Sequence, residues 1–191
     1  MTTPLAIRIV FWTWLIAAVA AGRQGWLQAM PASAVPALVL GLTALLALAY
    51  RRLGAFSAWV DALDVRGLVL LHVTRFVGFY FLVLYDRGVL PYAFAVPGGI
   101  GDIAVAALAL AVCLFPWGEA SRRRAISIWN IVGLIELLLT ILTAARLGLA
   151  EPGSMHALTQ LPLSLLPTFL VPLLLASHLV LYARVSHRGT T

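Results

Sequence analysis

Hydrophobic residues gather in six long runs, and most polar and charged residues lie in the short segments between them. A helix needs about 20 apolar residues to cross the hydrocarbon core of a membrane. Backbone polar groups find no water partner in lipid, so each run is expected to be helical. The pattern predicts membrane-spanning helices over residues 5–22, 34–50, 65–85, 99–116, 125–147 and 158–183.

The composition agrees with this pattern. Of the 191 residues, 62% are hydrophobic and 10% are charged, whereas soluble domains carry roughly 25% charged residues. These values exclude a soluble globular, a disordered, a collagen-like and a disulfide-stapled secreted protein. We predict an all-α fold, an integral membrane helical bundle of six transmembrane helices that forms a single domain over residues 1–191. The lipid bilayer is its expected partner, and a homo-oligomer is compatible with its size.

All thirteen basic residues are arginine, and their distribution predicts the orientation in the membrane. Cytoplasmic loops carry an excess of basic residues, and the side that holds both termini carries nine arginines against three on the other side. Both termini are therefore expected in the cytoplasm. No basic stripe with interleaved aromatic residues occurs, which argues against nucleic-acid binding. The nine are Arg8, Arg51, Arg52, Arg66, Arg122, Arg123, Arg124, Arg184 and Arg188, and the three are Arg23, Arg87 and Arg146.

Two short signals bear on processing and redox chemistry. Arg8, an apolar stretch and then Ala18-Val19-Ala20 resemble a signal peptide with its cleavage site, so removal of residues 1–20 is an alternative to a first membrane helix. Cys113 is the only cysteine, which excludes an internal disulfide and a cysteine-based metal site. No other spacing predicts a metal site.

Three charged residues lie within the apolar runs: Arg75, Asp102 and Glu136. A charge at such a position costs roughly 2.5–3.5 kcal/mol on insertion, and it usually faces the bundle interior. Arg75 and Glu136 both lie about 15 Å from the cytoplasmic ends of their helices, so they can form an ion pair if those two helices touch. Asp102 begins the fourth run and is expected near the outer surface.

Helical faces place further polar and small residues beside these charges. Asn130, Gly133, Glu136, Thr140 and Thr143 share one face of the fifth helix. Two interpretations stay open: a buried pair that only fixes helix packing, or a ligand-binding or proton-coupling site. The three charges sum to −1, and a carboxylate without a cationic partner in a low dielectric tends to hold a proton. Small-residue or polar stripes on the neighbouring helices are His72, Arg75, Gly78 and Asp86, and Asp102, Ala106, Ala109 and Cys113.

Two histidines, His72 and His178, are expected at similar depth in the third and sixth helices. Two histidines on neighbouring helices are a known axial ligand set for b-type haem, which is the only cofactor considered. The other interpretation is that both are hydrogen-bonded inside the bundle, together with Asn130.

Prolines predict two irregular segments. Pro91 and Pro97 oppose a continuous helix, so a re-entrant or interfacial segment is expected before the fourth helix, where Asp102 would cap the helix or form an outward-facing ligand site. Pro162, Pro167 and Pro172 predict a last helix that is kinked or partly unwound in its outer half. Ser164 and Thr168 are expected to satisfy the carbonyls that these prolines free, those of Leu158, Leu163 and Thr168.

One combination of motifs resembles a known family: Leu90-Pro91-x-x-Phe94-Ala95-x-Pro97-x-Gly99-x-Gly101-Asp102, then Asn130-x-x-Gly133-x-x-Glu136, then Pro167-Thr168-Phe169-x-Val171-Pro172-Leu173. It is similar to an uncharacterised family of small bacterial membrane proteins, over residues 75–180. Gly98 stands where alanine is usual, and Glu136 where aspartate is usual. The resemblance implies a bacterial inner-membrane location and no activity, substrate or cofactor.

The function predicted from these residues is a small transporter or permease-like subunit for a small solute or ion. Its site would comprise Arg75, Asp102, Asn130 and Glu136. The alternatives are a haem-binding or redox protein that uses His72 and His178, and a structural or assembly partner that transports nothing. The spacings typical of hydrolases do not occur, so enzyme activity is not expected.

Overall fold

The computed structural model describes residues 3–151 and 153–187, and these form helices and turns without β-strands. The all-α class is therefore confirmed. Six helical stretches are long and apolar enough to cross a membrane, one for each predicted run. They are Leu5–Arg23, Ala34–Arg52, Val65–Asp86, Tyr92–Leu114, Glu119–Ala150 and Leu166–Arg184. Arg188, which contributed to the arginine count, lies outside the described residues.

The chain divides into two compact units, which are described separately. Within the described residues, the first unit comprises 3–63, 145–151 and 153–176, and the second comprises 64–144 and 177–187. The expectation of one domain over the whole chain stays a prediction.

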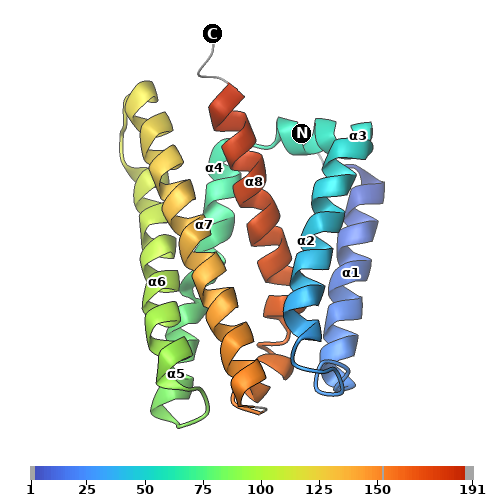
Figure 1. Cartoon of the computed structure of the whole chain (residues 1–191). Coiled ribbons are helices and arrows are strands. Elements are labelled where there is room, and N and C mark those ends of the chain that lie inside the picture. Colours follow the sequence, from blue (N-terminus) through green and yellow to red (C-terminus); the bar gives the residue numbers. More distant parts are fainter. Residues whose placement is uncertain (1–2, 152, 188–191) are drawn as a thin grey trace. The chain divides into compact units, whose positions relative to one another are not determined.

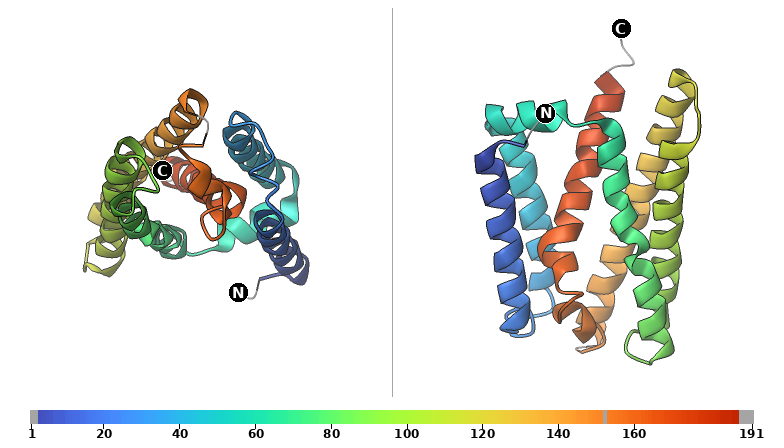
Figure 2. Two further views of the ribbon diagram at one scale, coloured as in Figure 1. Left: turned by 90° about the horizontal axis from the view of Figure 1, so that it is seen from below. Right: turned by 180° about the vertical axis from the view of Figure 1, so that it is seen from behind.

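The first unit contains α1 (Leu5–Arg23), α2 (Ala34–Arg52) and α3 (Gly54–Ala62). Helices α1 and α2 lie side by side, and the short α3 runs across their ends (Figure 1, Figure 2). Tyr50 near the end of α2 donates a hydrogen bond to Asp61 Oδ1 over 2.8 Å, which ties α3 to α2. The unit also holds the last turns of α7 (Glu119–Ala150), the 3₁₀ turn η2 (His156–Thr159), the π-helical turn η3 (Leu166–Leu170) and the start of α8 (Val171–His187).

The segment before α8 is irregular, as its prolines predicted. Residues 160–164 form turns, and a π-helical turn follows before α8 begins at Val171. Pro172 cannot donate to the carbonyl of Thr168, and that carbonyl accepts a hydrogen bond of 2.8 Å from Trp14 Nε1 instead. The Leu163 carbonyl accepts from the Leu166 N–H. An indole and a backbone turn therefore satisfy these two carbonyls, so the expectation that Ser164 and Thr168 would do so is wrong. The hydroxyl of Thr168 bonds to the Ser164 carbonyl instead.

The second unit begins with three consecutive helical segments, α4 (Val65–Leu70), the 3₁₀ helix η1 (Leu71–Val77) and α5 (Gly78–Asp86). A tight turn with Gly88 at a φ of +68° connects α5 to α6 (Tyr92–Leu114). Helix α6 returns alongside α5 and η1 (Figure 1, Figure 2). The parts of α7 up to Ala144 and of α8 from Ser177 complete the unit.

The predicted re-entrant segment before the fourth helix is wrong, because α6 is continuous from Tyr92 and contains Pro97. Pro97 removes one N–H, whose partner would have been the carbonyl of Ala93. An irregular segment among apolar side chains would leave several backbone groups unpaired. The loss of one hydrogen bond near the helix start is the smaller penalty.

Candidate functional site

The 3₁₀ helix η1 aligns the polar residues at the centre of the second unit. A 3₁₀ helix has three residues per turn, so side chains at i and i+3 lie in one row. His72 and Arg75 share such a row, and the buried Gly78 continues it. Runs of 3₁₀ longer than three to four residues are uncommon, and η1 has seven. Neither proline nor glycine occurs between Leu71 and Val77, so no sequence signal indicated this segment.

The guanidinium of Arg75 is the centre of a buried charge cluster. The residue is 1% exposed, and each of its three nitrogens has a partner. Nε donates to Asp102 Oδ1 over 2.5 Å, Nη1 donates to the Gly133 carbonyl over 3.0 Å, and Nη2 pairs with Glu136 Oε2. The structure therefore contains the expected contact of Arg75 with Glu136 and adds Asp102 to it. We call Arg75, Asp102 and Glu136 the charge cluster.

Asp102 lies deeper than predicted. Helix α6 begins at Tyr92, so Asp102 is ten residues, or about 15 Å, from the helix start. The N-cap of α6 is Pro91, without a side-chain cap. The expected positions of Asp102 as a helix cap and at an outward-facing site are therefore wrong. The physical reason is the continuous helix through Pro97, which carries Asp102 to the level of Arg75.

Glu136 is the more accessible of the two carboxylates. Its side chain is 18% exposed, against 7% for Asp102. Thr140, one turn further along α7, donates its hydroxyl to Glu136 Oε1 over 2.9 Å. A Cβ atom at Gly101 would lie 2.5 Å from this oxygen, so only glycine lets α6 approach Glu136 as it does.

Small residues allow the helices around the cluster to pack closely. A Cβ at Gly78 would overlap the carbonyl oxygen of Gly99, so α5 and α6 meet backbone to backbone beside Asp102. The predicted small-residue stripe of α6 is buried throughout, at Ala106, Ala109 and Cys113 as well as Asp102. Close approach through small residues is the usual way in which membrane helices pack.

His72 and His178 form a second polar group, which we call the imidazole pair. Both are fully buried, and their ring centroids lie 4.3 Å apart. His72 Nε2 contacts Ser177 Oγ at 2.9 Å, and His178 Nδ1 contacts Asn130 Oδ1 at 2.8 Å. The prediction that the histidines are hydrogen-bonded with Asn130 is confirmed for His178. Trp129 packs edge-on against His72 and donates to the Val105 carbonyl.

The hydrogen bonds of Asn130 determine the tautomer of His178. Asn130 Nδ2 donates to the His178 carbonyl over 3.1 Å, so the amide oxygen is the atom that faces the ring. An amide oxygen only accepts, and His178 Nδ1 therefore carries a hydrogen. Among the described residues, His178 Nε2 and His72 Nδ1 have no hydrogen-bond partner.

The imidazole pair does not fit the axial ligands of a haem. Metal–nitrogen bonds of about 2 Å on opposite sides of one ion would place the ring centres roughly 6 Å apart, whereas they lie 4.3 Å apart. Within residues 3–151 and 153–187, no group of three or more His, Cys, Asp or Glu side chains is placed to hold a metal ion.

Gly133 connects the imidazole pair to the charge cluster. Its carbonyl accepts from Arg75, and a Cβ at this position would lie 3.1 Å from His178 Cε1. The four predicted site residues thus lie in one unit. Arg75, Asp102 and Glu136 are in direct contact, whereas Asn130 bonds to His178 and has no recorded bond to the charges.

Residues 32–185 match the family described as Domain of unknown function (DUF8737). The chain belongs to this family. The matched region includes every member of the charge cluster and of the imidazole pair. The comparisons with curated proteins and with solved structures found no match.

Proposed function

We propose that this DUF8737 chain is a multi-pass protein of a bacterial inner membrane that moves a small solute or ion, as a transporter or a permease-like subunit. The charge cluster would be its site, and Asn130 a polar neighbour of that site. The observation that supports this proposal is the guanidinium of Arg75, which is buried among apolar helices and shared between two carboxylates.

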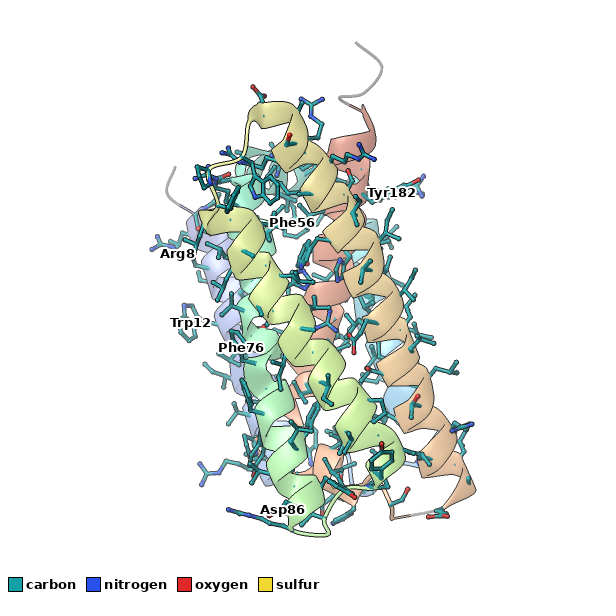
Figure 3. The ribbon with its side chains drawn as sticks, turned by 90° about the vertical axis from the view of Figure 1, so that its left-hand side faces the viewer. Arg8, Trp12, Phe56, Phe76, Asp86 and Tyr182 are labelled. Carbon is teal, nitrogen blue, oxygen red and sulfur yellow. The ribbon has the colours of Figure 1, made fainter. Side chains whose placement is uncertain are left out.

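The outer surface of the helices supports membrane insertion. Arg8 and Trp12 extend outward from α1 (Figure 3), and Trp12 is exposed although it lies inside an apolar helix. Soluble monomers rarely expose apolar patches larger than a few hundred Å², whereas lipid covers such surfaces. Each of the six long helices exposes large apolar side chains, among them Ile16, Leu45, Phe79, Ile100, Leu139 and Leu179.

A role in transport explains more features of the charge cluster than a role in helix packing alone. A buried ion pair is a weak source of stability, because well-packed apolar residues often serve as well. Ionisable residues within membrane helices often mark ion or substrate pathways. The central residue of the cluster, Arg75, also lies in a long 3₁₀ segment, a feature that frequently marks a functional hinge. A purely structural role remains the competing proposal, since all three nitrogens of Arg75 are satisfied.

Ligand-dependent stabilisation tests the proposal. The purified protein is unfolded by heat in detergent with ammonium, choline, glycine, glutamate, acetate or phosphate, which sample cations, zwitterions and anions. A ligand at 100 times its Kd stabilises the folded state by about 2.7 kcal/mol. We expect at least one compound to raise the unfolding temperature of the wild type and of Glu119→Gln, and to lose this effect in Glu136→Gln.

Uptake of the same compound into liposomes that contain the protein completes this test. If no compound stabilises the wild type, or if stabilisation is equal in Glu136→Gln, the charge cluster is not a solute site and the packing role is preferred.

The proposed orientation has its own test. In a Cys113→Ala background, Gln28→Cys lies in the loop assigned to the outside and Ser121→Cys near the start of α7, assigned to the cytoplasm. Both native side chains are exposed. A membrane-impermeant maleimide added to intact cells is expected to label Gln28→Cys alone. If only Ser121→Cys is labelled, the orientation is the reverse of the one proposed.

A further inference from the structure

We infer that the charge cluster binds one exchangeable proton and that Glu136 is the residue that carries it. This inference deepens the proposed function, because the proton is then the ion coupled to movement of the solute. Three observations support it: the charge of the cluster, the hydrogen-bond partners of its two carboxylates and the packing around Glu136.

The charge cluster has one negative charge more than its cation balances. Arg75 contributes +1 and the two carboxylates contribute −1 each, so the ionised cluster has a formal charge of −1. An unbalanced charge among apolar helices is strongly unfavourable. A bound proton would cancel this negative charge without any change in the positions of the helices.

The groups that face Glu136 are few. From η1 it meets Arg75, on α6 Asp102 shares this arginine, and from α8 His178 lies across Gly133. Helix α5 brings no charged side chain before Asp86 at its end. The other charged side chains of this unit lie near helix ends: Asp64, Arg66, Arg87, Glu119, Arg122, Arg123, Arg124 and Arg184.

The hydrogen-bond partners of the two carboxylates distinguish them. Both carboxylates face Arg75, which can only donate: Asp102 Oδ1 accepts from Nε–H, and Glu136 Oε2 pairs with Nη2. The partner of Glu136 Oε1 is the hydroxyl of Thr140, which can donate or accept. When Glu136 is protonated, its O–H can donate to Thr140 Oγ1. The threonine hydroxyl can then turn to the backbone carbonyl of Glu136, four residues earlier.

The packing around Glu136 favours a proton over a larger cation. Gly101 lies so close that even a Cβ atom would approach the carboxylate oxygen to 2.5 Å. In the uptake step, a hydronium ion transfers its proton to Oε1, an O–H bond forms, and one water molecule remains. The formal charge of the cluster changes from −1 to zero. Release to water reverses each of these changes.

Infrared difference spectroscopy of the whole protein in lipid bilayers, between buffers of different pH, tests the inference. We expect the C=O stretching band of a protonated carboxyl group on acidification. This band should move to lower frequency when glutamate is ¹³C-labelled at the carboxyl carbon and stay in place when aspartate is labelled. Glu136→Gln should abolish it, and Glu119→Gln, in the exposed first turn of α7, should retain it.

The labelling experiment needs no substitution, so it holds even if a variant misfolds. Thr140→Val should shift the band, because the O–H of Glu136 loses its partner, and Thr140→Ser should restore its position. A band that moves with labelled aspartate, a band that survives Glu136→Gln, or no labelled carboxyl band would overturn the inference. A Glu136 band without any stabilising solute would retain the proton site and remove the transport proposal. If the protein takes up a solute but does not show this band, the transport proposal is retained and the proton site is removed.

Discussion

In the second unit one buried cation contacts two carboxylates, whereas in the first unit every described charged side chain is exposed. The buried polar side chains of the first unit are hydroxyls, at Thr43, Ser164 and Thr168. Two of these three donate to backbone carbonyls of their own segment. The buried hydroxyls of the first unit thus bond to its backbone, whereas the second unit encloses a charge cluster with a formal charge of −1.

Both units contain an irregular helix, and the causes differ. In the first unit prolines free carbonyls before α8, and Trp14 reaches one of them from α1. In the second unit the chain tightens into η1 without any helix-breaking residue, and the tightened segment carries His72 and Arg75. Irregularity from proline is a local property of the chain, whereas that of η1 accompanies contacts with α6, α7 and α8. We therefore expect function in the second unit.

The largest effect is expected from removal of the single cation. Arg75→Gln leaves two carboxylates without a partner among apolar helices, and breaking a buried pair costs about 3–5 kcal/mol. Thermal unfolding in detergent measures this loss. Arg146→Gln, at an exposed arginine of the first unit, is the control, with a change within about 0.5 kcal/mol. If Arg75→Gln is as stable as this control, the charge cluster does not organise the second unit.

Neutralising the two carboxylates separately should give unequal results. A hydrogen bond to a charged group contributes about 1.5–3 kcal/mol, and Asp102→Asn weakens the 2.5 Å contact with Arg75 Nε. Glu136→Gln removes the surplus charge and keeps an oxygen that can accept from Thr140 or Arg75, so it should cost less than Asp102→Asn. Unfolding midpoints of the two variants give the comparison. If Glu136→Gln destabilises the protein more than Asp102→Asn does, Glu136 is the carboxylate that stays ionised beside Arg75.

Two glycines should respond in opposite directions. Gly78→Ala forces α5 away from Gly99, and overpacking of this kind costs about 1–3 kcal/mol. Gly41 in α2 has no neighbour within 4 Å of an added Cβ, so Gly41→Ala should stabilise the protein by about 0.5–1 kcal/mol. Chemical unfolding of both variants tests this. Equal effects would show that close helix approach in the second unit is not required.

The smallest effect is expected in the first unit. Trp14→Phe leaves the carbonyl of Thr168 without its donor, which should cost about 1 kcal/mol. Trp26→Phe, at an exposed indole, should change the stability by less than half as much. Amide hydrogen exchange around Thr168 should accelerate only in Trp14→Phe. Unchanged exchange there would mean that the π-helical turn holds without the indole.

Part of the site could be predicted from the sequence. The depths of Arg75 and Glu136 follow from counting residues along apolar helices, and both residues lie in contact. The predicted depth of Asp102 is wrong, because α6 continues through Pro97. The penalty of a proline is local, but whether a helix accepts it depends on the alternatives that the surrounding packing leaves. Segment η1 could not be predicted, since nothing in its own residues requires it.

The amino-acid sequence alone determined that the chain consists of six long apolar helices, that proline disrupts the segment before the last one, and that Arg75 and Glu136 lie far from the ends of their helices. These properties depend on residue type and spacing along one helix. Only the tertiary structure decided that one guanidinium joins two carboxylates, that two imidazoles meet beside them, and that Trp14 satisfies a carbonyl more than 150 residues away. Such contacts depend on which faces of distant helices meet, and no local pattern contains that information.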